Sequence, residues 1–365
     1  MIRSQKNLAD LEAKMLASYA VLSGKSRGRR HPEPEAEDRL CFQRDRDRIL
    51  HSRAWRRMKD KTQVFVAHHG DHYRNRLTHS LEVAQISRDL ARTLGLNEDL
   101  AESIALAHDL GHTPFGHAGE HTLSACLQAE GLNFEHNRQS RRVVEELEHV
   151  YPHFEGLNLS IEVLEGMMKH ETFWDLPNGH TGVHPSLEAQ VVNLGDEIAY
   201  QNHDVDDGLR SGLFSEKDLE HLALWKKAGE AVEARYGHIE EARIRQARTV
   251  SAMIGVMMKD IAEETSRLLE MSGIKTLEDV YECEEKLVAF SPLMNVENKA
   301  LKDFLMTRLY LHPEVVAHSK RGQAVIEFLF KHLRQEMECE ELRDYLAGMT
   351  DSFALGLAQE LGFSL

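Results

Sequence analysis

The chain has 365 residues, of which 42% are hydrophobic and 28% charged, which is enough for one large core or two and is typical of globular proteins. The formal net charge of -16 argues against a protein that coats nucleic acid, because such proteins bind phosphate through an excess of Lys and Arg. The 4 cysteines form no Cys-x-x-Cys pair, and no apolar run reaches the roughly 18 residues of a membrane span. We therefore expect a cytoplasmic protein with no membrane partner.

The charge is not spread evenly, because residues 25–61 carry 13 Lys and Arg against 7 Asp and Glu. Such a segment suits a polyanion, so single-stranded nucleic acid is one conceivable partner. The alternative is a solvated helix face of ion pairs, which contributes little. Both interpretations stay open for Arg46, Arg48, Arg56 and Arg57. We interpret residues 25–31 as a surface loop.

Helical periodicity dominates and no alternating strand of useful length is present, so we predict an all-α fold. The first clear helical stripe consists of Leu77, Leu81, Ala84, Ala91 and Leu94. Gly95 suits a left-handed cap that ends this helix. Asn97 suits the N-cap of a second helix, which Gly111 and Pro114 end next to a group of histidines.

Further helices are expected over residues 116–130, 137–150 and 160–169. Pro185 and Ser186 begin a longer helix, which we expect to reach about Asp207 and to stop before Gly208. Residues 215–365 look like further amphipathic helices without a motif that indicates chemistry.

The segment from Ala107 to His121 holds four histidines and two carboxylates in fifteen residues. Imidazole and carboxylate together suit a borderline or hard divalent ion. Successive helical residues diverge by about 100°, so an ion must lie in the notch between His108 and Asp109 and take its other ligands elsewhere. His79 on the preceding helix and Asp196 on the later long helix are suitable. We interpret His121 as a solvated residue outside the site.

The order of motifs resembles the HD superfamily, and within it the deoxynucleotide triphosphohydrolases of dGTPase type. The motifs concerned are Asp45-Arg46-Asp47-Arg48-Ile49, Trp55-Arg56-Arg57-Met58, Lys61-Thr62-Gln63-Val64, Arg76-Leu77-Thr78-His79-Ser80, the segment from Ala107 to His121, Phe134-Glu135-His136-Asn137, Asp196-Glu197-Ile198-Ala199-Tyr200 and Asp204. They span residues of about 40 to 207, and the C-terminal third adds little. The resemblance implies an N-terminal helix and basic loop over 1–39, an HD core over 40–210, and a helical region over 211–365 that packs on the core and in subunit contacts.

The resemblance also implies one catalytic divalent metal, for which Mn, Mg, Fe, Co and Ni stay open. Its implied ligands are His79, His108, Asp109 and Asp196. The histidines that line the phosphate channel would be His112, His117 and His136. His117 and Glu120 would form the proton-transfer couple, and their i, i+3 spacing at the start of a helix lets the carboxylate orient the imidazole.

For the substrate, the resemblance implies that Arg76 faces the α-phosphate and that Gln63 reads the sugar 3'-hydroxyl. Tyr200 and Asp204 would pack against the deoxyribose, where a ribose 2'-hydroxyl would clash. Tyr200 lies four residues after Asp196, so it suits a core position as well as a place beside the ligand. Asn137 and Lys169 are further candidate substrate contacts.

We therefore predict attack of water at the α-phosphorus of a dNTP, which releases a deoxynucleoside and inorganic triphosphate. Two alternatives stay open. An HD enzyme acting on nucleoside monophosphates or cyclic nucleotides would have no need of the three-histidine channel, and a nucleotide-sensing or single-strand-binding protein would have no need of His117 and Glu120. By the same resemblance we expect a homo-oligomer, a dimer or hexamer, and a second dNTP as a conceivable activator. Base preference is not indicated.

Overall fold

The computed structural model describes residues 3–63, 74–168 and 184–364. Throughout these ranges the elements are helices, with only two isolated bridges, Arg29 to Ser160 and Thr62 to Asn75. The predicted all-α fold is confirmed. No helix in the described ranges has the length and apolar character needed to cross a membrane.

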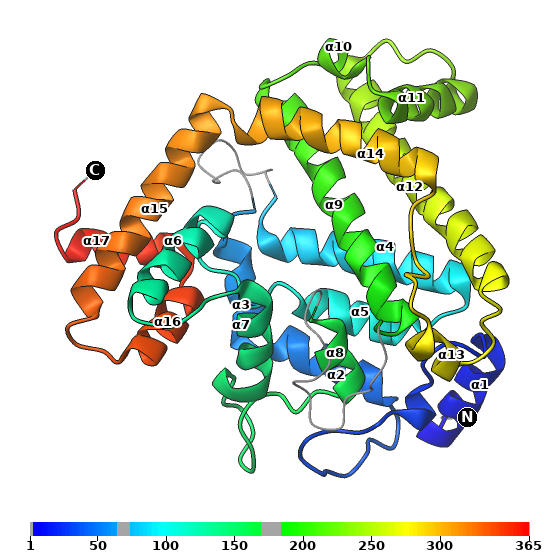
Figure 1. Cartoon of the computed structure of the whole chain (residues 1–365), viewed down its shortest axis with the longest axis horizontal. Helices are drawn as coiled ribbons and strands as arrows, with labels where there is room; N and C mark the ends of the chain where they lie inside the picture. Colours follow the sequence, from blue (N-terminus) through cyan, green and yellow to red (C-terminus); the bar gives the residue numbers. More distant parts are fainter. Residues whose placement is uncertain (1–2, 64–73, 169–183, 365) are drawn as a thin grey trace.

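The first half of the chain builds the centre of the molecule. Its elements are α1 Gln5–Met15, a 3₁₀ turn Ser23–Lys25, α2 Cys41–His51, α3 Arg53–Arg57, a 3₁₀ turn Met58–Asp60, α4 Arg76–Leu94, α5 Glu98–Ala107, α6 Gly116–Ala129, α7 His136–Arg142, a π-helical turn Val143–Leu147, α8 Ile161–Gly166 and α9 Leu187–Ser211. Helices α4, α5 and α9 pack on one another, and α2 and α8 pack against α5 (Figure 1).

A glycine lets α9 approach α4 closely at the point where the site forms. A Cβ on Gly195 would lie 2.5 Å from Oγ of Ser87 on α4. Any side chain larger than hydrogen would push the two helices apart. Because Asp196 is the next residue, this contact also sets how near that carboxylate lies to α4.

The predicted C-terminal end of α4 agrees with the structure, but one residue of the predicted apolar stripe is not buried. Asn75 caps the first turn by accepting from the N–H of Thr78, and Gly95 ends the helix with a φ of 71°. Leu81 is 46% exposed, so its placement on the buried stripe was wrong. Since α4 packs against both α5 and α9, its buried face is wide and is displaced from the stripe read in the sequence.

Three other helices end differently from the prediction. Helix α9 continues through Gly208 to Ser211, where Gly212 caps it with a φ of 75°. Gly208 serves close packing instead, since a Cβ there would lie 2.2 Å from the ring of Phe214. The helix expected over 137–150 is α7 followed by the π-helical turn, and the one expected over 160–169 is the shorter α8.

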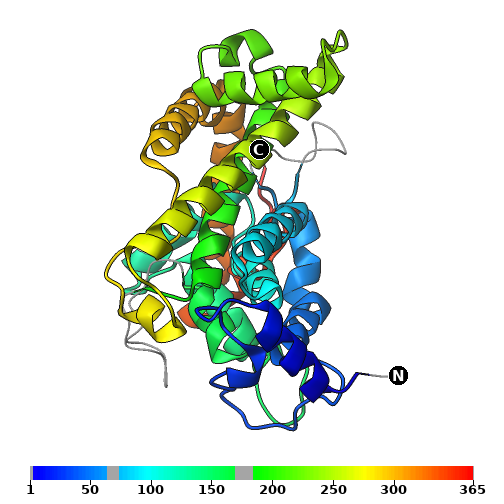
Figure 2. The same ribbon diagram turned by 90° about the vertical axis from the view of Figure 1, so that its right-hand side faces the viewer.

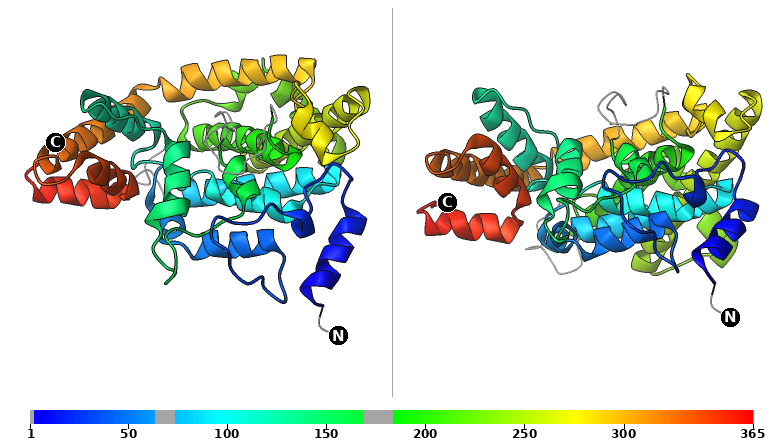
Figure 3. Two further views of the ribbon diagram at one scale, coloured as in Figure 1. Left: turned by 60° about the horizontal axis from the view of Figure 1, so that its bottom comes forward. Right: turned by 90° about the horizontal axis from the view of Figure 1, so that it is seen from below.

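The second half of the chain forms two further groups of helices. Its elements are α10 Glu216–Leu219, α11 Ala223–Tyr236, α12 Ala242–Met271, α13 Leu277–Glu282, α14 Pro292–Leu305, a π-helical turn Met306–Tyr310, α15 Pro313–Leu333, α16 Cys339–Gly348 and α17 Asp351–Glu360. Helices α12 and α14 pack on α9, and Figure 2 shows α12 running along its outer side. Helices α15 to α17 join α6 around a second apolar core at one end of the molecule (Figure 3).

Six of the 13 Lys and Arg of the basic segment pair with acids of the same chain, and two of these, Arg27 and Arg29, lie in the predicted surface loop of residues 25–31. Arg29 contacts the fully buried Asp45, and Arg27 pairs with Glu162 and Glu165 on α8. Arginines of this segment that pair with acids are Arg27, Arg29, Arg39, Arg44, Arg46 and Arg48. Arg27 therefore attaches this part of the chain to α8, and Arg29 attaches it to α2.

Candidate active site

Four side chains from three helices of the centre converge. His79 lies on α4, His108 and Asp109 follow α5 directly, and Asp196 lies on α9. Nε2 of His79 lies 3.0 Å from Oδ1 of Asp196. Nε2 of His108 lies 3.1 Å from Oδ1 of Asp109 and 3.6 Å from Oδ1 of Asp196. Ligand atoms bound about 2 Å from one ion have such spacings, so His79, His108 and Asp196 form a group that could hold a divalent metal, and Asp109 lies next to it beside His108.

The two imidazoles have their lone pairs directed at this point. Nδ1 of His108 donates to the carbonyl of Ala105 at 2.6 Å, which leaves Nε2 as the unprotonated nitrogen. That Nε2 is buried and has no hydrogen-bond partner among the described residues. A buried acceptor of this kind fits a metal ligand, because an unpaired polar atom is otherwise costly.

His79 is oriented by two residues that the sequence analysis did not select. Its Nδ1 lies 3.4 Å from Nδ1 of His203 on α9, and Nε2 of His203 contacts the carboxylate of Glu82. A carboxylate beside Nε2 favours the tautomer of His203 that is protonated there, because a carboxylate only accepts, and this tautomer leaves Nδ1 to accept from Nδ1–H of His79. Nε2 of His79 then keeps its lone pair for a metal. Burial, and then the proximity of His79, lower the pKa of His203 well below its usual range, which keeps that ring neutral.

Asp109 connects this group to the neighbouring basic residues. Its Oδ2 accepts from Nη1 of Arg76 at 2.8 Å, and its Oδ1 lies 3.1 Å from Nδ1 of His112. Burial alone would raise the pKa of the Asp109 carboxyl, but the neighbouring His108, His112 and Arg76 hold this pKa well below its usual range. Asp109 is therefore ionised, as a metal ligand must be.

The three histidines predicted for the phosphate channel form a second cluster. Ring centroids lie 3.9 Å apart for His112 and His136, and 5.5 Å apart for His112 and His117. Glu120 accepts from Nδ1 of His117 at 3.1 Å and from Nδ1 of His136 at 2.9 Å. Although burial opposes ionisation, hydrogen bonds from His117 and His136 hold the pKa of Glu120 far below its usual range. The ionised carboxylate therefore orients two imidazoles at once.

Tyr200 and Asp204 follow Asp196 at successive turns of α9. Tyr310, at the end of the π-helical turn after α14, donates its hydroxyl proton to Asp204. Burial raises the pKa of Asp204 to about 8, and burial also raises that of Tyr200. Tyr310 was not selected from the sequence, because no motif marks the C-terminal third.

All these groups face one cavity of about 750 Å³. The predicted site residues that line it are Gln63, Arg76, His79, Asp109, His112, His117, His136, Asn137, Asp196, Tyr200 and Asp204. His108 and Glu120 lie behind this lining and contact it through the bonds given above. Lys169 lies outside the described residues. His121 is exposed, in agreement with its omission.

The C-terminal third contributes more to the cavity than the sequence suggested. Its lining residues are Lys286, Val288, Met306, Tyr310, Val315 and Ser319. Gln63, which the sequence predicted, also lines the cavity. Its Oε1 is buried and has no hydrogen-bond partner among the described residues. The walls therefore come from both halves of the chain.

Comparison with known proteins agrees with this geometry. Residues 76–201 match the model of the HD domain, and residues 288–342 match that of the phosphohydrolase-associated domain. A deoxyguanosinetriphosphate triphosphohydrolase-like protein of Geobacter sulfurreducens is 47% identical over 371 residues, covering 96% of each chain. A protein of the same name from Azoarcus sp. is 46% identical and covers 94% of this chain and 96% of its own.

This chain belongs to the dGTPase-like family of the HD superfamily. A third relative of that name, from Brucella anthropi, is 44% identical over 93% of each chain. The predicted resemblance is confirmed, and with it a phosphohydrolase. The HD match begins at Arg76 and ends just past Tyr200, so it contains the four candidate metal ligands and the histidine cluster. The second match contains Val288, Tyr310 and Val315 of the cavity wall.

Proposed function

We propose that this dGTPase-like chain hydrolyses deoxynucleoside triphosphates to a deoxynucleoside and inorganic triphosphate. The observation that carries the proposal is one cavity lined both by His79, Asp109 and Asp196, with His108 directly behind them, and by a cluster of three imidazoles. A volume of about 750 Å³ suits a nucleotide. The names of the relatives point to the same reaction and to dGTP as one substrate.

His79, His108, Asp109 and Asp196 would hold one divalent cation, which supplies positive charge at the α-phosphoryl group and makes a water molecule more acidic. The donor set fits, because Nε2 of His79 and Nε2 of His108 lie 3.0 and 3.6 Å from Oδ1 of Asp196, and Oδ1 of Asp109 lies 3.1 Å from Nε2 of His108. Arg76 holds Asp109 on one side and lines the cavity with the rest of its guanidinium. It would therefore bind a phosphoryl oxygen next to the ligand group.

The phosphate chain would extend along His112, His117 and His136. When protonated, His117 and His136 would each keep a second N–H at Nε2 for the phosphate oxygens, which a monophosphate would not need. His117 is the exposed member, with its side chain 69% exposed. Since its Nδ1–H is held by Glu120, the imidazolium of His117 would give its Nε2 proton to the departing 5'-oxygen as a general acid and become neutral.

The sugar would lie against Tyr200 and Asp204, with Gln63 on the facing wall. Asp204 is fixed by the hydroxyl of Tyr310, so it cannot turn away to admit an additional hydroxyl. Such a wall would exclude a ribose 2'-hydroxyl by contact and by the cost of leaving that polar group without a partner. Deoxynucleotides are therefore the proposed substrate class.

The proposal includes a homo-oligomer, as the family resemblance implies. A nucleic-acid partner is not part of the proposal; six of the 13 Lys and Arg of residues 25–61 pair with acids of the same chain, which weakens the case for such a partner without testing it. A dNTP activator would appear as stimulation of one dNTP by another.

The test is product analysis on the four dNTPs, singly and mixed, with Mn²⁺ or Mg²⁺ and with Asp109→Ala as the inactive control. Inorganic triphosphate and deoxynucleoside from the wild-type chain alone would support the proposal. Cleavage of monophosphates or cyclic nucleotides, with dNTPs left intact, would replace it by the alternative HD chemistry. Binding of dNTPs without turnover in any condition would favour a sensor.

A further inference from the structure

The loop between Asp109 and His117 is held by an acid that lies more than 200 residues later in the chain. Asp351, the first residue of α17, is only 6% exposed. Its Oδ1 accepts from the backbone N–H of Phe115 at 3.0 Å, and its Oδ2 accepts from the backbone N–H of Thr62 at 3.1 Å. One carboxylate thus joins the loop that leads to His117 to the segment that carries Gln63.

A buried lysine makes a second connection between the same parts. Nζ of Lys61 donates to the carbonyl of His112 at 2.5 Å and to the carbonyl of Ala347, in α16, at 2.9 Å. Lys61 is 3% exposed. Burial, together with the charge of Arg76, lowers its pKa to about 7. Burial of an amino group costs free energy unless the group is hydrogen-bonded. The two carbonyl acceptors offset part of this cost and fix the position of Nζ.

The loop needs external support because its own conformation is unfavourable. Phe115 has a φ of 63°, a left-handed conformation that residues with a Cβ rarely adopt. It is the N-cap of α6 but provides no side-chain cap. Its ring lies against α15, where a Cβ on Gly322 would lie 2.6 Å from it. The C-terminal helices therefore hold Phe115 by its backbone and by its ring.

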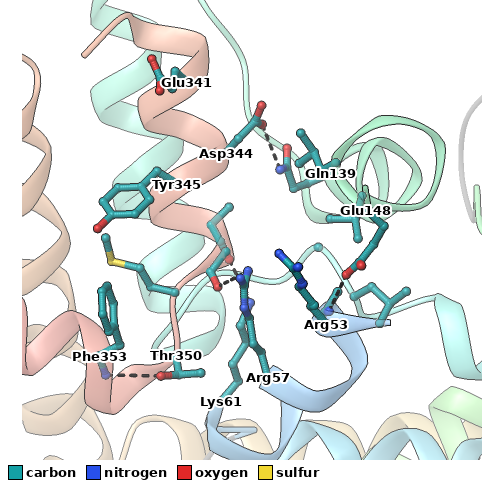
Figure 4. Close-up of a pocket in the computed structure, with 18 of the residues that line it drawn as sticks. Arg53, Arg57, Lys61, Gln139, Glu148, Glu341, Asp344, Tyr345, Thr350 and Phe353 are labelled. Carbon is teal, nitrogen blue, oxygen red and sulfur yellow. Dashed lines mark hydrogen bonds between the residues drawn. The ribbon is translucent and has the colours of Figure 1, made fainter. Parts of the chain in front are cut away.

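A cavity lies behind the start of the loop. It has a volume of about 550 Å³ and lies between α3, α7 and the pair α16 and α17, with Leu110 and Gly111 in its lining (Figure 4). Figure 4 shows Lys61 and Arg57 on one side and Tyr345 and Phe353 on the other. Gly111 is held by α7, because its N–H donates to Oγ of Ser140 at 2.8 Å. The later part of the loop has the contacts of Lys61 with His112 and of Asp351 with Phe115.

We propose that Asp351 and Lys61 are positioning residues of the active site, which set the distance between the Gln63 segment and the His112 to His117 loop. They act through backbone groups and do not touch the substrate. The role in turnover rests on the proposed function, whereas the role in fixing the loop does not. The C-terminal helices are by this inference part of the catalytic apparatus and not an appendage.

The test compares three variants of the full chain. Asp351→Asn leaves one acceptor for two N–H groups, and Lys61→Met removes the donor while filling its place. Asp344→Asn is the matched control, because Asp344 lies on α16 at the same interface but bonds Gln139 and Arg142 of α7. We would measure kcat and KM for a dNTP, the melting temperature, and hydrogen exchange of residues 112–116 without substrate.

We expect kcat to fall roughly 10- to 100-fold in Asp351→Asn, because displacements of about 1 Å carry penalties of this size. Lys61→Met should lose about tenfold in kcat without a lower melting temperature, since an apolar side chain tolerates this site better than a charge. Exchange of residues 112–116 should rise in both variants. Asp344→Asn should keep kcat and loop exchange, whatever its melting temperature.

Two results would overturn the inference. One is a fall of kcat that follows the melting temperature across all three variants, which would indicate a purely structural role. The other is unchanged exchange of residues 112–116 in both Asp351→Asn and Lys61→Met. If the wild-type chain cleaves no dNTP, the proposed function fails, and the exchange measurement still decides whether Asp351 and Lys61 fix the loop.

Discussion

The two walls of the cavity are built in different ways. The wall with His79, His108, Asp109 and Asp196 comes from α4, the end of α5 and α9, which pack directly on one another in the central core. The wall with the histidine cluster comes from a loop and the first turns of α6 and α7, and its loop is held by α16 and α17. The first wall owes its geometry to helix packing, and the second to a few long-range polar contacts.

This difference indicates that a substitution in one wall should leave the geometry of the other wall unchanged. Loss of a ligand on the helical wall should remove the metal and leave the loop in place. Loss of support for the loop should slow turnover and leave metal binding intact. The following predictions test this separation, beginning with the largest expected effect.

Asp109→Ala should have the largest effect, because Asp109 serves both walls. It is a candidate ligand beside His108, and it holds Arg76 at 2.8 Å. We expect loss of measurable dNTP hydrolysis and loss of the rise in melting temperature that Mn²⁺ gives to the wild-type chain by binding the folded state. Differential scanning fluorimetry over a range of Mn²⁺ concentrations checks this. Equal stabilisation of both proteins would show that Asp109 is not a ligand.

His117→Asn should lower kcat by roughly 10²- to 10⁴-fold, the usual contribution of a general acid. Because His117 lies on the loop-side wall, its removal should not change the affinity for Mn²⁺ measured by calorimetry. His121→Asn is the matched control, as it lies one turn later on α6 and is exposed. Similar losses in both variants, or a loss of metal in the first, would contradict the assignment.

The fold and the helical wall were largely predictable from sequence. Apolar periodicity, Asn97 as an N-cap and Gly95 as a C-cap are local signals, and the structure has all of them. What failed was the reading of Gly208 as a helix end. Its small size serves a contact with Phe214, which lies beyond the helix and cannot be read from local patterns.

The residues that orient the site were harder to find. His203 and Glu82 act on His79 only because α9 crosses α4, so no spacing within one segment reveals them. Asp351 follows an N-cap threonine and looks like an ordinary first-turn acid, which favours the helix dipole. Its contacts with Thr62 and Phe115 depend on a chain reversal over hundreds of residues. Candidate catalytic and metal-binding residues occur in sequence motifs. The residues that position them need only be near them in space and can lie anywhere in the sequence.

His203→Ala should weaken metal binding by roughly 10- to 100-fold, the usual effect of removing a residue that orients a metal ligand. Without its acceptor, Nδ1–H of His79 loses its direction and the tautomer that frees Nε2 is no longer preferred. His203→Asn should recover part of the affinity, because an amide oxygen can accept the same proton. Competition with a chromophoric chelator measures this, and the visible spectrum of the Co²⁺ form reports the ligand geometry. Unchanged affinity in the alanine variant would remove His203 from the helical wall.

The smallest effect that we expect is on stability. Lys61→Met should change how the free energy of unfolding depends on pH. The pKa of Lys61 is about 7 in the folded chain and about 10.5 when unfolded, so between these values the unfolded state binds more protons. The contribution of this site to the free energy of unfolding is therefore lowest below pH 7. Between the two pKa values it rises with pH, by up to roughly 1.4 kcal/mol per pH unit. Relative to the wild type, the methionine variant should be most favoured at pH 6 and should lose this advantage towards pH 9. Urea unfolding at pH 6, 7.5 and 9 checks the slope, and Asp344→Asn serves as a control because its own titration lies below this range. A stability difference between Lys61→Met and the wild type that does not vary with pH would mean that Lys61 keeps an ordinary pKa. The loop wall would then not be sealed from water as the contacts with His112 and Ala347 require.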